Sequence, residues 1–140
     1  MEIESTAAAL QIAVGRLVRR LRQTHVPGDL TLSEASVLSR LDRDGATTSS
    51  ELANGERVKP QAMGATIQTL EQRALVSRAP DPDDGRRVVI TITPDGRRLL
   101  TDRRSLKTHA LAEAIGHLTD DEQRALNEAA RLLDRLAEQL

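Results

Sequence analysis

The segment 81–94, DPDDGRRVVITITP, limits the possible folds more than any other part of the chain. It starts with Asp, Pro and Gly, continues with two arginines and a β-branched run, and ends at Thr93-Pro94. A turn-forming acidic segment before a β-branched run predicts a β-hairpin, and Thr followed by Pro is typical of a helix start. We therefore expect strands at 76–79 and 87–92 around a basic loop, followed directly by a helix.

The residues before this hairpin have a helical pattern. Pro60 suits the first turn of a helix, and Met63, Ile67 and Leu70 recur at four- and three-residue spacing, which predicts an inward face. The outward face offers uncharged hydrogen-bonding groups suited to base edges, namely Gln61, Gln68 and Thr69. Alone, this pattern fits an ordinary amphipathic helix with a solvated face. The neighbouring hairpin favours recognition of DNA by a winged helix-turn-helix.

Two Thr-x-x-Glu patterns, at 31–34 and 48–51, have the spacing of a capping box and predict two further helices. The first helix should bury Val37, Leu38 and Leu41 and stop at Asp44-Gly45. The second should be short and include Leu52 and Ala53. We expect Asn54-Gly55 to end it.

The outer parts of the chain predict long amphipathic helices. Residues 9–21 carry an apolar stripe, and Thr93-Pro94 should start a helix that reaches about Gly116. Thr119-x-x-Glu122 should open a last helix with a second stripe, formed by Leu126, Ala129 or Ala130, Leu133, Leu136 and Leu140. Such stripes need a partner, within the chain or from a second chain.

The chain has a net charge of −1, but its charges are unevenly distributed. Residues 57–104 contain ten Lys and Arg against six Asp and Glu, a local net charge of +4, whereas 31–56 and 105–140 each carry −3. The basic part is the predicted helix and hairpin, as expected for a nucleic-acid contact.

Composition removes several classes of function. Without cysteine there is neither a disulfide nor a thiol sensor of peroxide. Without Phe, Tyr or Trp there is no platform for stacking unpaired bases, which favours duplex DNA over single strands or RNA. No apolar run has the length of a membrane span and the N-terminus lacks signal-peptide character, so we expect a cytoplasmic protein without membrane contact.

Four motifs together resemble the MarR family of bacterial transcriptional regulators: Val58-Lys59-Pro60, the run 67–76, Asp84-Gly85-Arg86 and the run 92–96. The resemblance implies a mainly α fold with a small β-hairpin wing, a winged helix-turn-helix with N- and C-terminal dimerisation helices. It implies one domain over 1–140, with the DNA-binding lobe at about 31–93 and dimerisation helices at about 5–25 and 94–140.

The resemblance also implies a function. It implies a sequence-specific regulator that binds a pseudo-palindromic double-stranded operator as a homodimer, a repressor released by a small lipophilic or aromatic effector, with no cofactor. The DNA-binding residues that it implies are Lys59, Pro60, Gln61, Ala62, Ala65, Gln68, Thr69, Asp84, Arg86 and Arg87. Gln61 would meet adenine and Ala62 a thymine methyl in the major groove. Arg86 would enter the minor groove, and Asp84 would orient Arg86 or Arg87 by a charge-assisted hydrogen bond.

The sequence departs from the family pattern at several positions. Ala65 and Thr69 stand where arginines are frequent, which increases the importance of the wing. Ala74 replaces a usual glycine, and a left-handed backbone there would cost about 1 kcal/mol. Glu56 and Arg57 stand where an apolar residue and a glycine are common, so the turn between the two motif helices is less well defined.

Three alternatives differ in class. An enzyme is disfavoured, because the sequence has neither a nucleophile with a base nor a phosphate-binding loop. A zinc-responsive regulator of the same fold would have to use His109 and His117, which lack the usual ligand spacing. A winged helix that binds protein would present an apolar face instead of Gln and Thr.

Overall fold

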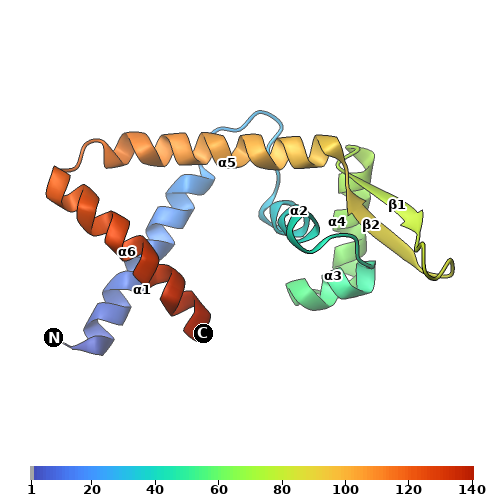
Figure 1. The fold of residues 1–140 in the computed structure, drawn as a ribbon, viewed down its shortest axis with the longest axis horizontal. Helices are drawn as coiled ribbons and strands as arrows, with labels where there is room; N and C mark the ends of the chain where they lie inside the picture. Colours follow the sequence, from blue (N-terminus) through green and yellow to red (C-terminus); the bar gives the residue numbers. More distant parts are fainter. Residues whose placement is uncertain (1) are drawn as a thin grey trace. The chain divides into compact units, whose positions relative to one another are not determined.

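The computed structural model describes residues 2–140. The chain forms two compact units, Met1–His25 with Ser105–Leu140 and Val26–Arg104. The elements in chain order are α1 (Ile3–Arg22), α2 (Leu32–Asp44), α3 (Ser49–Glu56), α4 (Pro60–Gln72), β1 (Val76–Pro80), β2 (Val88–Ile92), α5 (Pro94–Ile115) and α6 (Asp120–Gln139) (Figure 1). The predicted mainly α fold with a small hairpin is confirmed.

Three helices start at the Thr-x-x-Glu patterns that the sequence offered. At α2, Glu34 N–H donates to Thr31 Oγ1 at 3.1 Å and the carboxylate of Glu34 accepts from Thr31 N–H at 2.7 Å, and the same reciprocal pair opens α6. At α3 the backbone N–H of Glu51 donates to Thr48 Oγ1 at 3.2 Å, but the Glu51 carboxylate has different partners. The pattern therefore predicted all three starts, with a complete capping box at two of them.

The two strands pair antiparallel, with Val76 opposite Ile92 and Pro80 opposite Val88. β1 extends one residue further than predicted and β2 begins at Val88 instead of Arg87. Thr47, before α3, adds a third strand position, because its backbone exchanges two hydrogen bonds with Ile90, at 3.2 and 2.7 Å. The hairpin is thus attached to the helical part of its unit.

The core of the unit Val26–Arg104 is aliphatic, as the absence of aromatic residues requires. Its buried cluster consists of Leu30, Ala35, Val37, Leu38, Leu41, Leu52, Ala53, Met63, Ile67, Leu70, Leu75, Val76, Ile90, Ile92 and Leu100. Every residue predicted to face inward from α2 and α4 belongs to this cluster. The periodicity of the sequence therefore identified the buried faces.

The expected break of α3 at Asn54-Gly55 is wrong. The helix continues through both residues to Glu56, and Arg57 adopts the left-handed conformation with φ of 54°. Arg40 explains the extension, because its guanidinium lies over Gly55 and donates to the Gly55 carbonyl at 3.0 Å. A side-chain donor at the last carbonyls stabilises a helix end, so the backbone can turn one residue later.

Ala74, after α4, has a φ of 58°, so the left-handed conformation is kept without glycine. We expect Ala74→Gly to raise the free energy of unfolding by about 1 kcal/mol, because glycine adopts this conformation without steric cost. Urea denaturation measures the change. Ala65→Gly, in the interior of α4, is the matched control and should lower stability by a similar amount. A loss of stability in both variants would contradict the assignment.

The helices of the other unit have no buried residue in α1 or α6. Large apolar side chains are exposed on both helices, among them Ile12, Leu17 and Val18 on α1 and Leu126, Leu132, Leu133 and Leu136 on α6. Lys107 donates to the carbonyl of Leu21 at 2.8 Å, near the end of α1. None of the helices described for residues 2–140 has the length and hydropathy needed to cross a membrane.

Candidate nucleic-acid interface

Helix α4 presents one buried and one exposed face. Lys59 precedes the helix in an extended conformation and Pro60 occupies its first turn, while Met63, Ile67 and Leu70 lie in the core. The candidate residues of this helix region are all exposed: Lys59, Pro60, Gln61, Ala62, Ala65, Gln68 and Thr69. Between residues 60 and 70 this exposed face is uncharged, with Lys59 just before it and Glu71 beyond it near the end of the helix.

The threonines of α4 satisfy their hydroxyls locally. Thr66 donates to the carbonyl of Ala62 at 3.2 Å, and Thr69 donates to the carbonyl of Ala65 at 3.1 Å. Such bonds to the preceding turn occupy the hydroxyl hydrogen. Thr69 therefore offers a methyl group and an acceptor oxygen at the exposed face.

The wing loop is closed by its own hydrogen bonds. Asp81 N–H donates to the carbonyl of Arg87 at 2.8 Å, and Arg87 N–H donates to the carbonyl of Asp84 at 3.0 Å. Asp84 Oδ1 accepts from the backbone N–H of Arg86 at 3.1 Å. The charge-assisted hydrogen bond of Asp84 thus goes to the backbone of Arg86, and the carboxylate shapes the turn, as aspartate commonly does in such loops.

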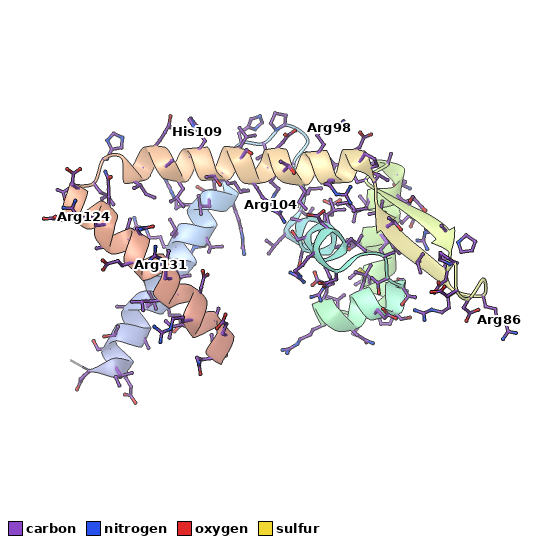
Figure 2. The ribbon with its side chains drawn as sticks, viewed as in Figure 1. Arg86, Arg98, Arg104, His109, Arg124 and Arg131 are labelled. Atoms are coloured by element: carbon purple, nitrogen blue, oxygen red, sulfur yellow. The ribbon has the colours of Figure 1, made fainter. Side chains whose placement is uncertain are left out.

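Arg86 and Arg87 are adjacent but differ in surroundings. Arg86 lies at the end of the wing loop with its side chain directed away from the strands (Figure 2). Arg87 donates to Glu51 Oε1 at 2.9 Å and lies 3.8 Å from Asp81 Oδ2. Glu51 and Thr47 were not expected to contribute to the wing. Glu51 had one sequence signal, the helix-start pattern at 48–51, and Thr47 had none.

Ion pairing reduces the number of cations available to DNA. Seven arginines of 57–104 lie within 4.0 Å of a carboxylate, namely Arg73, Arg78, Arg87, Arg97, Arg98, Arg103 and Arg104. In the part of the chain that the structure describes, Arg57, Lys59 and Arg86 have no acidic partner. Arg57 follows the end of α3, Lys59 immediately precedes α4, and Arg86 lies at the end of the wing loop. The unpaired positive charge therefore brackets the uncharged face of α4.

Glu56 holds the turn before α4. Partial burial opposes its ionisation, but hydrogen bonds from Ser36 and Arg40 outweigh this effect and lower the pKa of Glu56. Arg40 Nη2 lies 2.9 Å from Glu56 Oε2. The charge of Glu56 is therefore neutralised within the turn, close to where α4 begins.

The histidines show no metal site. His109 lies 3.3 Å from Glu113 one turn further along α5. Among residues 2–140 no three His, Cys, Asp or Glu side chains come together in a way that could hold a metal ion.

Comparison with known proteins gives a consistent result. The model of the MarR family matches residues 30–88. The HTH-type transcriptional regulator MT0903.1 of Mycobacterium tuberculosis is 36% identical over 133 residues, which cover 95% of this chain and 93% of the relative. The HTH-type transcriptional repressor Rv2887 of the same species is 34% identical over 110 residues, covering 79% and 77%.

A solved structure agrees with these relatives. The crystal structure of a Pseudomonas aeruginosa protein assigned as a transcriptional regulator is 34% identical to this chain and superposes with a TM-score of 0.83. The match covers 95% of this chain and 94% of that one. The likeness therefore extends over nearly all of both chains, beyond the wing and α4.

Proposed function

The chain belongs to the MarR family of DNA-binding transcriptional regulators, and on that premise we propose that it is a repressor that binds a pseudo-palindromic operator as a homodimer. Its relatives are transcriptional regulators, and the chain is likewise a regulator and not an enzyme. The repressor assignment is supported by Rv2887, a relative that carries that name. Release by a small lipophilic or aromatic effector follows from the family resemblance and belongs to the same proposal.

The observation that carries the proposal is the arrangement of unpaired charge. Arg57 and Lys59 lie in the turn before α4, and Arg86 extends from the wing. Cations bind phosphates and enter narrow minor grooves, whereas uncharged Gln and Thr groups can be matched to base edges. A winged helix that binds protein would need an apolar exposed face on α4, and α4 does not present one. Duplex DNA is therefore the favoured partner.

The proposed division of labour follows from this arrangement. Gln61, Ala62, Ala65, Gln68 and Thr69 contact base edges in the major groove, with Lys59 and Pro60 at the entry of the helix. Arg86 enters the adjacent minor groove, and Asp84 and Arg87 shape the wing. Residues 31–93 form the DNA-binding lobe, and the helices at 5–25 and 94–140 dimerise. Two lobes would then read half-sites about 34 Å apart.

Arg86→Ala tests the wing. We expect weaker binding to operator fragments selected from genomic DNA. The log-log slope of affinity against salt concentration should be shallower by about 0.9, because the variant loses one cation that neutralises a phosphate. Fluorescence anisotropy over a salt series measures both quantities. Arg98→Ala is the matched control, because Arg98 is also exposed but is paired with Asp95 at 2.9 Å. Equal slopes for the Arg86 variant and the wild type would refute the wing assignment.

Gln61→Ala tests the base contact separately. The variant should bind random duplex like the wild type, since Gln61 carries no charge. It should lose preference at one base pair in each half-site, by about 1 to 3 kcal/mol if the contact is bidentate. Selection of bound fragments by sequencing reports this change. An unchanged preference at every position would remove Gln61 from the interface.

A further inference from the structure

We propose that Glu51 limits the overall affinity for DNA, because it withholds the charge of Arg87 from the DNA backbone while Arg86 stays available. The inference rests on the proposed DNA-binding function and adds to it a residue that lies on α3, outside both the wing and α4. Its basis is the set of contacts that the Glu51 carboxylate makes.

The two oxygens of Glu51 bind different partners. Oε1 accepts from Arg87 Nη2 at 2.9 Å, and Oε2 accepts from the hydroxyl of Thr47. Thr47 is itself bonded through its backbone to Ile90 of β2. Thr47 therefore holds one oxygen of the Glu51 carboxylate, and the other oxygen binds Arg87 of the wing.

This arrangement departs from the other two helix starts of the same kind. At α2 and α6 the glutamate of the Thr-x-x-Glu pattern turns back to the threonine backbone N–H. At α3 only Thr48 makes its half of the box, and the Glu51 side chain goes to Arg87 and Thr47. A carboxylate that forgoes the usual capping bond in favour of the wing arginine indicates a role at the wing.

The charges around Arg87 make its guanidinium a poor phosphate ligand. Glu51 lies at hydrogen-bonding distance, and Asp81, which is largely buried with 16% of its side chain exposed, lies at 3.8 Å. Two carboxylates thus accompany one cation, and the cluster has no net positive charge. Arg86, one residue earlier, has no such partner in the part of the chain that the structure describes. The two neighbouring arginines therefore attract a phosphate very differently.

Withholding a cation weakens sequence-independent binding, because phosphate contacts strengthen binding to every sequence alike, whereas groove contacts distinguish sequences. An Arg87 free to bind phosphate would add the same free energy to operator and to random duplex, so both affinities would rise. The ion pair itself is half-exposed, and such pairs contribute little to stability. Its removal should therefore change DNA binding more than folding.

The test uses the full chain and a fluorescein-labelled duplex of random sequence. Glu51→Gln should bind this duplex more tightly than the wild type does, and the log-log salt slope should steepen by about 0.9, because Arg87 gains a phosphate contact. The affinity for a selected genomic operator should rise by about the same factor, because a phosphate contact strengthens binding to every sequence alike. Circular dichroism and denaturation should match the wild type.

Two variants isolate the cause. Asp83→Asn also removes one negative charge from the wing region, but Asp83 has no arginine partner within the described residues, so its salt slope should stay at the wild-type value. The double variant Glu51→Gln, Arg87→Gln restores the wild-type net charge without a freed arginine, and its slope should return to the wild-type value.

The outcomes separate the two proposals. If the slope of Glu51→Gln equals that of Asp83→Asn, or if the double variant keeps the steep slope, Arg87 is not the group that Glu51 withholds and the inference is overturned. If the wild type itself binds neither duplex at low salt, the DNA-binding proposal fails first.

Discussion

Replacing Gly96 with alanine is expected to lower the free energy of unfolding of the unit Val26–Arg104 by about 3 kcal/mol. A Cβ atom at this position would lie 2.2 Å from the carbonyl oxygen of Leu75 and 3.0 Å from a side-chain carbon of Ile92. The oxygen cannot move away freely, because it accepts the backbone N–H of Thr93 at 3.0 Å. The start of α5 would therefore have to separate from the hairpin.

Gly64→Ala is the matched control for this experiment. Gly64 also lies in a helix, but a Cβ there would meet no atom within 4 Å, so alanine should be neutral or raise stability by up to about 1 kcal/mol. Urea denaturation followed by circular dichroism compares the two variants. If Gly96→Ala were as stable as Gly64→Ala, the close approach of α5 to Leu75 would be wrong.

The motif that includes Gly96 illustrates what sequence alone could predict. Thr93-Pro94 correctly indicated the start of α5, because the cap is local: Thr93 Oγ1 accepts from Gly96 N–H at 3.0 Å. The same hydroxyl donates to the carbonyl of Ala74 at 2.6 Å, which joins the helix start to the end of α4. That contact spans the whole hairpin, and no local pattern could predict it.

Local sequence could predict part of the candidate DNA-binding site but not all of it. The exposed face of α4 could be predicted, because burial in a helix follows a fixed period. The difference between Arg86 and Arg87 could not, because it depends on Glu51, which lies 36 positions earlier in the chain. Local sequence likewise placed the end of α3 too early, since the stabilising Arg40 comes from α2. Ion pairs between distant segments are thus what the sequence analysis missed.

The apolar stripes of α1 and α6 are local patterns and could be predicted from the sequence. Both stripes are exposed in the single chain. Half of the surface of Leu136 is accessible and none of the residues of either helix is buried. Two amphipathic helices without a buried residue leave a large apolar area in water, and such areas mark interaction surfaces. A second copy of the chain offers a matching surface, as the proposed homodimer requires.

Substituting Leu133 and Leu136 together with aspartate is expected to produce a monomer that has lost about 10²- to 10⁴-fold in operator affinity. The charges would be buried in the dimer interface, and without the partner each lobe binds its half-site alone, so the gain from simultaneous contact disappears. The unit Val26–Arg104 has its own core, so part of the helical content should remain. Light scattering and anisotropy measure assembly and binding.

The control adds the same charge to the polar side of α6. Asn127→Asp with Arg131→Gln lowers the net charge by two on the side of α6 that faces away from Leu133 and Leu136, and it should leave both the dimer and operator binding close to those of the wild type. Because both double variants lower the net charge by two, a general repulsion of DNA would affect them equally. A monomeric Leu133, Leu136 variant that kept wild-type operator affinity would show that the terminal helices do not couple the two lobes, and the proposed reading of a two-fold operator would then have to be abandoned.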